Sequence, residues 1–318
     1  MKGLKIALLD MQTLTDGDMP LDVFSQFGEV TKSVTLSGGE LADMVRDKDV
    51  VLCNRSVMSA DIINSAKKLK YIGLFATGYN NVDLAAAKKR GITVCNVPGY
   101  STEAVVQQAM CFLLMLAGST EKYSAYVKAG KWSFSGERSY FPYKLYGLAG
   151  KTIGIFGMGN MGRRMAELCS AFCMHVIYFS RTQKDLPYEF VSKEELFKRS
   201  DFLSFHCPAN EETAEVLNKE TIALMKDGAF IINTARGGLI DEPALIDALQ
   251  TGKIAGAGLD VAAEEPLSAD NPLLKAKNVI FTPHVGWGTI ETRKRLIELT
   301  AENLRRYIEG SPVNMVSI

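Results

Sequence analysis

Short apolar runs alternate with amphipathic stretches along the first hundred residues of the chain. Strand-like runs separated by helical stretches favour a parallel, doubly wound sheet. The expected strands span residues 5–10, 29–35, 49–54, 71–76 and 92–96. The expected helices are clearest at 41–48, 60–69 and 82–90, and Gly91 follows the last of them, where a C-terminal cap is expected.

A second alternating series begins at residue 151 and predicts a second parallel sheet, of six strands. These strands span residues 151–156, 175–179, 201–206, 229–233, 254–260 and 278–282. The helices between them include 160–172, 193–199 and 242–250, and Ser192 with Glu195 predicts a capping box for the second. A last amphipathic helix over 289–309 has no strand after it, so we expect it to pack on the first sheet.

The first turn of the second series carries a glycine motif. Residues 157–162 read Gly-Met-Gly-Asn-Met-Gly, after a strand-like run and at the start of a helix-like one. In such a turn Gly157 permits a tight bend, Gly159 lets the backbone approach a pyrophosphate, and Gly162 allows close packing of helix and strand. Unpaired N–H groups at the helix N-terminus then face the anion. This context favours a dinucleotide site over an ordinary turn.

The chain is long for one hydrophobic core, which favours two domains. Because the glycine motif lies mid-chain, we expect one domain of residues 1–98 plus 288–318 and an inserted domain of 99–287. A helix-like stretch over 101–117 is apolar nearly all round, which predicts burial between domains or in a subunit contact.

An irregular segment over 131–150 is rich in aromatic rings, which are unlikely to stay free in water. We therefore interpret 118–150 as a dimerisation segment that packs on a partner subunit, rather than as a lid on its own domain. Its rings belong to Trp132, Phe134, Tyr140, Phe141, Tyr143 and Tyr146.

Composition excludes several classes of protein. Lys and Arg together number 36, as do Asp and Glu, so neither nucleic acid nor a membrane surface is an expected partner. No apolar run is long enough to span a bilayer, and the N-terminus shows no signal-peptide pattern. Cys169 and Cys173 share a helix face, but with three His and no Cys-x-x-Cys we expect no metal site. We expect a reduced, soluble, cytoplasmic protein.

Three chemically active residue types follow strands of the second sheet. Arg236 follows strand 229–233, Asp260 ends strand 254–260 with Glu264-Glu265 shortly after it, and His284 follows strand 278–282. The carboxyl ends of parallel strands share one edge, where ligands gather. There a His suits proton transfer to a carbonyl, a carboxylate orients the imidazole, and an Arg grips a carboxylate or carbonyl.

Structural roles are the alternative for each of these residues. Arg236 could form a structural ion pair and His284 could be a satisfied core histidine, but their joint position favours a functional site. His206 also ends a strand, and we interpret it as a cofactor-edge or structural residue rather than a second acid. His175 begins its strand at the opposite edge and receives no chemical role.

Motifs along nearly the whole chain are similar to those of the D-2-hydroxyacid dehydrogenase family. They are residues 76–83 (ATGYNNVD), 96–102 (NVPGYST), the Gly157 loop, 233–238 (NTARGG), Asp260-Val261, Glu265-Pro266 and 282–284 (TPH). The resemblance implies a flavodoxin-like substrate domain, an inserted Rossmann domain, a usually dimeric enzyme, and hydride transfer between a nicotinamide cofactor and a small 2-keto acid.

The same resemblance implies residue roles. Arg236 binds substrate and polarises its carbonyl, His284 is the acid/base, and Glu265 is the carboxylate partner of His284. The implied substrate-binding residues are Asn54, Arg55, Thr77, Gly78, Tyr79, Arg236, His284 and Trp287. The implied cofactor-binding residues are Thr102, Val106, Gly157, Met158, Gly159, Asn160, Met161, Gly162, Ser180, Arg181, Thr182, His206, Cys207, Pro208, Thr213, Thr234, Ala235, Arg236, Asp260, His284 and Gly286.

Within the family, the wording of residues 76–81 and 284–287 looks most like the glycerate dehydrogenase (hydroxypyruvate reductase) branch. Phosphoglycerate dehydrogenase, whose substrate phosphate Arg55 could meet, and D-lactate dehydrogenase stay open as alternatives. So does a nucleotide-sensing protein like the corepressors built on this fold, because fold alone does not decide function.

One departure bears on the cofactor. NAD-specific members place an Asp after the second strand to hold the ribose hydroxyls. Here Ser180-Arg181-Thr182 stands at that point, and an Arg with two hydroxyls suits a 2′-phosphate. We therefore predict a preference for NADP over NAD; the alternative is that Arg181 stacks over adenine without selecting.

Overall fold

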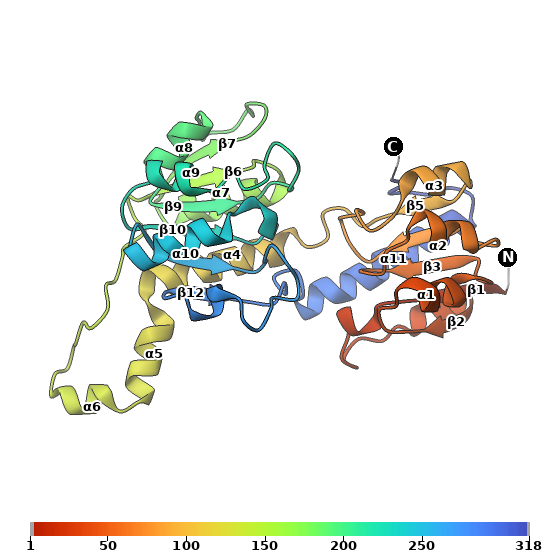
Figure 1. Cartoon of the computed structure of the whole chain (residues 1–318), viewed down its shortest axis with the longest axis horizontal. Helices are drawn as coiled ribbons and strands as arrows, with labels where there is room; N and C mark the ends of the chain where they lie inside the picture. The colour runs from red at the N-terminus through yellow and green to blue at the C-terminus, as the bar shows by residue number, and fades with distance from the viewer. Residues whose placement is uncertain (1–2, 317–318) are drawn as a thin grey trace. The chain divides into compact units, whose positions relative to one another are not determined.

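The computed structural model describes residues 3–316, which form two compact units (Figure 1). Unit 1 comprises the chain up to Tyr100 together with the chain from Gly288 onward, and unit 2 runs from Ser101 to Trp287. The sequence placed the first boundary after residue 98, two residues before its position in the structure, and it placed the second before residue 288, where the structure also has it.

Unit 1 is built on a five-stranded parallel sheet in the order β2-β1-β3-β4-β5. This is the flavodoxin-like order of a doubly wound sheet, which confirms the predicted fold class. The strands are β1 (Leu4–Leu8), β2 (Gly28–Lys32), β3 (Val50–Cys53), β4 (Tyr71–Leu74) and β5 (Thr93–Cys95). Two short 3-10 helices, η1 (Met11–Thr13) and η2 (Asp22–Gln26), separate the first two strands.

The helices of unit 1 are α1 (Gly38–Val45), α2 (Ala60–Ser65), α3 (Leu84–Lys89) and α11 (Ile290–Ile308). Thr289 caps α11 by accepting a hydrogen bond from the Thr292 N–H, and Leu296 and Leu304 lie on its buried face. Helix α11 packs on β4 and η2, so the last helix of the chain completes the first unit.

Unit 2 contains a parallel sheet of seven strands in the order β12-β11-β10-β9-β6-β7-β8. The strands are β6 (Thr152–Phe156), β7 (His175–Phe179), β8 (Glu189–Phe190), β9 (Phe202–Phe205), β10 (Ala229–Asn233), β11 (Ile254–Leu259) and β12 (Val279–Phe281). The expected count of six was wrong, because β8 has only two residues at an exposed edge and leaves no periodic pattern.

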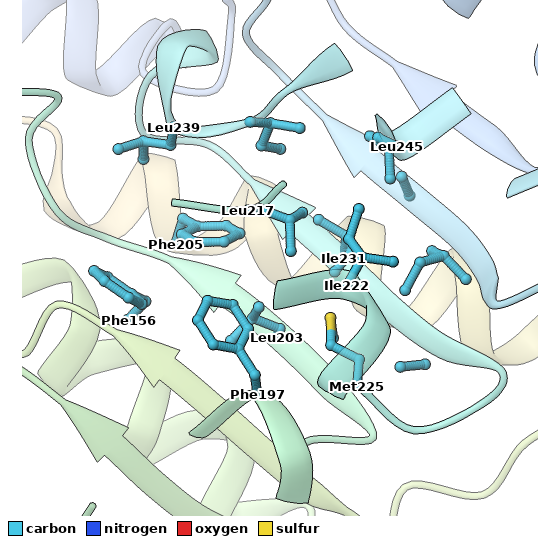
Figure 2. Close-up of a cluster of buried hydrophobic side chains, with 14 of the residues drawn as sticks. Phe156, Phe197, Leu203, Phe205, Leu217, Ile222, Met225, Ile231, Leu239 and Leu245 are labelled. Atoms are coloured by element: carbon cyan, nitrogen blue, oxygen red, sulfur yellow. The ribbon is translucent and has the colours of Figure 1, made fainter. Parts of the chain in front are cut away.

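Helices cover both faces of this sheet. One face packs under α8 (Lys193–Arg199), α9 (Lys219–Leu224) and α10 (Glu242–Thr251), and Figure 2 shows its core, which includes Phe156, Phe205 and Ile231. The other face packs under α4 (Thr102–Gly118) and α7 (Asn160–Ala171), with Ile155 and Ile232 in its core. Neighbouring strand residues thus alternate between two hydrophobic layers. Two 3-10 helices, η3 (Gly237–Leu239) and η4 (Pro272–Lys275), complete the unit.

Two helices extend from unit 2 away from its sheet (Figure 1). These are α5 (Thr120–Lys128) and α6 (Lys131–Ser135), and neither contains a buried residue. The expectation of irregular structure from residue 131 was wrong at its start, where α6 forms, whereas 136–151 contains no helix or strand. We call residues 118–150 the arm.

Two further expectations concern cysteines and membranes. Cys173 lies beyond the last residue of α7 and is exposed, so it does not share a helix face with buried Cys169. The described part of the chain holds no group of three or more His, Cys, Asp or Glu able to bind a metal ion. Within residues 3–316 no single helix is long and apolar enough to cross a membrane; only α4 and α5 together, bent by 61°, have the length and composition.

Candidate active site

The glycine motif forms the turn between β6 and α7. Gly157 has φ +103°, and a side chain there would press on the His206 carbonyl carbon at 2.7 Å. A side chain on Gly162 would clash with the Gly157 carbonyl oxygen, whereas one on Gly159 would meet nothing within 4 Å. The motif thus combines a turn that favours glycine, tight packing and an open approach to the N-terminus of α7, which is the cradle that a pyrophosphate requires.

Two buried polar atoms at the same edge of the sheet have no hydrogen-bond partner. They are His206 Nδ1 and Thr234 Oγ1, two of three such side-chain atoms among the described residues. His206 follows β9 and Thr234 follows β10, and these strands are neighbours, paired in register through Phe205 and Asn233. Buried polar groups normally have partners. Together with the glycine turn, these two atoms fit the polar groups of a bound dinucleotide.

His206 is a buried, neutral ring. Burial lowers its pKa to about 4, and Nε2 lies 2.8 Å from Ser204 Oγ. A ring that is neutral near pH 7 has no proton to give there, so its surroundings argue against use as a second acid.

Asp260 fastens the loop that follows β12. Its buried carboxylate accepts hydrogen bonds from the Thr282 hydroxyl, from the Val285 N–H at 3.0 Å and from the Gly286 N–H at 2.8 Å. A side chain on Gly286 would approach Asp260 Oδ2 to 2.7 Å, so the loop lies directly against the carboxylate. The geometry gives Asp260 a positioning function; its contact with the cofactor stays a prediction.

His284, on this loop, forms a hydrogen bond with Glu265, which lies on the loop after β11. His284 Nδ1 lies 2.6 Å from Glu265 Oε2, with 31 % and 27 % of the two side chains exposed. Glu265 Oε1 also accepts from the Ala262 N–H at 3.3 Å. Because the carboxylate engages Nδ1, Nε2 is the ring nitrogen that remains for another partner. His284 adopts φ +56°, an uncommon conformation for a residue other than glycine.

Arg236 lies on the loop after β10, with an exposed side chain. Buried Asn233 holds this loop at two points: its side-chain NH₂ donates to the Arg236 carbonyl at 2.8 Å, and its side-chain oxygen accepts from the Ala235 N–H at 3.0 Å. Arg236 Nη1 donates to the Ala235 carbonyl at 2.7 Å. Asn233 was not among the predicted site residues, although a polar residue closing an apolar strand was a visible signal.

The loops that carry Arg236 and Glu265 are in backbone contact. A side chain on Gly237 would clash with the Ala262 carbonyl, so only glycine fits there. Glu242, the first residue of α10, accepts from the Ala263 N–H at 2.8 Å and from Asn271 Nδ2 at 3.1 Å. The sequence reasoning missed Glu242 as well. Arg236, Glu265 and His284 are thus brought to one edge of one sheet, as predicted.

In unit 1, Asp10 organises the predicted substrate loop at residues 54–56. Its buried carboxylate accepts from the N–H groups of Asn54, Arg55 and Ser56 at 2.7, 2.8 and 3.0 Å, and from the Ser56 hydroxyl at 2.7 Å. Burial raises the pKa of Asp10, but the bonds from Ser56 and Asn54 outweigh it and lower that pKa below its usual value. Arg55 is exposed on a loop whose backbone is held by the Asp10 carboxylate.

The second predicted substrate loop adjoins the first within unit 1. Asn81 Nδ2 donates to the carbonyls of Asn54 and Ser56 at 3.1 and 3.0 Å. Thr77 Oγ1 donates to the Val97 carbonyl at 3.0 Å, and the Tyr79 side chain is exposed. The N–H groups of Thr77, Gly78 and Tyr79 therefore belong to a braced loop beside Arg55.

The remaining predicted cofactor residues differ in exposure. Thr102 begins α4, and Thr213 bonds to the Pro208 carbonyl at 2.8 Å and so shapes the turn after Cys207. Val106 is fully buried in the core under α4, so its side chain offers no exposed surface to a cofactor.

Residues 110–286 match the family model described as D-isomer specific 2-hydroxyacid dehydrogenase, NAD binding domain. The chain belongs to the D-isomer specific 2-hydroxyacid dehydrogenase family. It is 38 % identical to a hydroxypyruvate reductase of Blautia hydrogenotrophica, over 99 % of this chain and all of that protein. A glyoxylate reductase of Thermococcus litoralis is 41 % identical, over 88 % of this chain and 86 % of its own length.

Among solved structures, an acyclic imino acid reductase (Bsp5) in complex with NADPH and D-Arg is similar, with a TM-score of 0.87 and 28 % identity over 99 % of this chain and 100 % of that one. Membership of the D-2-hydroxyacid dehydrogenases confirms the predicted family, enzyme class and nicotinamide cofactor. The protein is a nicotinamide-dependent oxidoreductase of 2-hydroxy acids.

Proposed function

We propose that this dehydrogenase reduces a small 2-keto acid of the hydroxypyruvate or glyoxylate type, reversibly, to the D-2-hydroxy acid. The observation that carries the proposal is the His284–Glu265 pair, 2.6 Å apart, on the same sheet edge as Arg236. The printed names of the relatives from Blautia hydrogenotrophica and Thermococcus litoralis support this substrate class.

In this mechanism a bound reduced nicotinamide supplies the hydride. His284 donates a proton through Nε2 to the carbonyl oxygen, since a keto group reduced without a proton would leave an alkoxide. Glu265 keeps Nδ1 protonated and the ring oriented, and Arg236 binds the substrate carboxylate and polarises its carbonyl through a planar pair of N–H donors. Within unit 1, the N–H groups of Thr77, Gly78 and Tyr79 form, with Asn54 and Arg55, the loop cluster that we propose for substrate binding.

The test is a panel of 2-keto acids assayed with NADPH and with NADH. We expect the highest kcat/KM with hydroxypyruvate or glyoxylate, and a loss of about 10²-fold or more in kcat for His284→Ala. A protein that binds NADPH yet turns over no 2-keto acid would contradict the proposal and favour a nucleotide sensor. Highest efficiency with phosphohydroxypyruvate or pyruvate would instead favour the phosphoglycerate or lactate alternative.

We also propose that NADP is preferred over NAD. Ser180, Arg181 and Thr182 follow β7, at the point where a carboxylate would hold the ribose hydroxyls. Arg181 is exposed, and the relative in complex with NADPH supports the use of the phosphorylated cofactor on this fold. The same panel measures this preference, and a higher kcat/KM with NADH would overturn it.

Finally, we propose that the arm joins two copies of the chain in a homodimer. Within the arm some rings pack together, since Tyr126 stacks on Tyr140 with centroids 5.8 Å apart. Others stay uncovered: 90 % of Phe134 and 73 % of Phe141 is exposed. Exposed rings gathered on one extended segment are typical of a subunit interface.

A further inference from the structure

The loop after β7 carries a second cation that the sequence motif did not include. Lys184 Nζ donates to Thr182 Oγ1 at 2.8 Å, so the ammonium group lies against the proposed 2′-phosphate loop. Arg181, in the same loop, is exposed. Two positive charges thus occur within four residues of each other, and the next residue with an acidic side chain is exposed Asp185.

A buried tyrosine holds Lys184 in place. The Tyr178 hydroxyl accepts from the Lys184 N–H at 2.9 Å and donates to the Lys184 carbonyl at 3.1 Å. Tyr178 itself is fully buried on β7. One hydroxyl therefore satisfies both backbone groups of Lys184 and closes the loop over residues 179–183, which limits where the lysine side chain can lie.

Thr182 and Lys184 can still donate hydrogen bonds to a ligand, whereas Ser180 cannot. Ser180 Oγ donates to the Thr182 carbonyl at 2.7 Å, so its hydrogen is already engaged. Thr182 Oγ1 accepts from Lys184, which leaves the hydroxyl hydrogen of Thr182 for an outside acceptor. Lys184 has three N–H donors and uses one of them on Thr182. The loop therefore offers donors and positive charge, as a phosphate dianion requires.

From this geometry we propose that Lys184 is a specificity-determining residue that binds the 2′-phosphate of NADP together with Arg181, and that Tyr178 is its positioning residue. The inference rests on the proposed preference for NADP. It adds a second cation, Lys184, and the Tyr178 hydroxyl that holds the backbone of Lys184. Neither residue lies in the Ser180–Thr182 motif.

The experiment measures dissociation constants for NADPH and NADH by fluorescence titration of the full-length protein, alongside kcat/KM with each. We expect Lys184→Gln to weaken NADPH binding about tenfold, because it removes a charge-assisted contact, and NADH binding less than twofold. Lys184→Arg is expected to stay within about threefold of the wild type, since the charge is kept. Lys151→Gln, which changes an exposed lysine just before β6, at the opposite sheet edge, is the matched control and should change neither constant.

Tyr178→Phe removes both hydrogen bonds to the Lys184 backbone and so tests the positioning role of Tyr178. It should weaken the binding of NADPH but not of NADH. The double variant with Lys184→Gln should bind NADPH no worse than Lys184→Gln alone, because Tyr178 acts on the phosphate only through Lys184. Equal weakening of NADPH and NADH, or a fall in melting temperature with unchanged NADPH affinity, would overturn the role of Lys184. A wild-type preference for NADH would overturn only the proposed preference, because the two titrations of Lys184→Gln still report on Lys184 separately.

Discussion

Two histidines follow strands of the unit 2 sheet, and their surroundings give them different chemistry. His206 is buried, with its pKa lowered to about 4, whereas His284 shares a hydrogen bond with a carboxylate and is partly exposed. A histidine that moves protons needs a partner for the charged ring and an accessible ring nitrogen, and of these two residues only His284 combines a carboxylate partner with partial exposure. Residue type alone therefore does not separate the two.

The buried state of His206 predicts a dependence of stability on pH. The ring's pKa is about 4 in the folded protein and near 6.5 in an unfolded chain. Protonation thus favours unfolding, so the contribution of the neutral ring is complete above about pH 6.5 and declines as the pH falls toward 4. Between pH 7 and pH 5 the cofactor-free protein should lose about 2 kcal/mol through this residue.

Urea unfolding at the two pH values measures this loss. The His206→Gln variant controls for the other titrating groups and should lose about 2 kcal/mol less than the wild type over the same interval. Equal losses in the two proteins would show that the ring is not kept neutral by the fold.

At the residue scale, the sequence predicted the candidate reacting groups and Asp260, and it missed Asp10 and Glu242, which also hold loops of the candidate site. Arg236, Glu265 and His284 each follow a strand closely, so their common edge could be inferred from strand order. Asp10 and Glu242 act on partners 44 to 46 and 21 residues away, respectively. Such contacts depend on how loops fold back on one another, and no local pattern encodes that.

At the scale of elements, long periodic segments were predicted well and short ones were not. The two parallel sheets followed from alternating strand and helix patterns, and fold class is confirmed. The missed elements include β8, an exposed pair of residues, α6 with five residues and α9 with six. Helix α9 did carry a signal, since Asn218 and Thr221 form a capping box. Elements this short depend on their neighbours more than on their own periodicity.

Helix α10 provides the prediction at this scale, because its first residue, Glu242, holds the loop of Glu265 through the Ala263 N–H. In Glu242→Ala that bond and the one to Asn271 are lost, so Glu265 is less firmly placed against His284. We expect kcat to fall about tenfold and KM for the cofactor to change little, a loss of about 1.4 kcal/mol in transition-state stabilisation.

Glu242→Gln is the matched variant, since its amide oxygen can still accept from Ala263, and it should recover most of the activity. Steady-state kinetics and melting temperatures are measured together. A variant that loses stability but keeps the wild-type kcat would show that Glu242 serves the fold alone.

For the whole molecule, the proposed dimer is tested by changing the uncovered rings. Phe134→Asp combined with Phe141→Asp replaces two exposed rings of the arm with charges. Helices α5 and α6 contain no buried residue, so the change removes no packing contact from their cores. We expect the wild type to sediment as a dimer and the double variant as a monomer with unchanged circular dichroism, because a buried unpaired charge disfavours association. Sedimentation velocity over a range of concentrations distinguishes the outcomes, and a wild-type monomer would contradict the proposal.

The close approach at Gly237 constrains how this enzyme can change its substrate. The Arg236 and Glu265 loops touch through backbone atoms, so an insertion in either would displace Arg236 and the carboxylate partner of His284 together. The loops at residues 54–56 and 77–79 are braced separately in unit 1, by Asp10 and by Val97. Selection or design can therefore change the loops of unit 1 separately, whereas the Arg236 and Glu265 loops of unit 2 vary only as one piece.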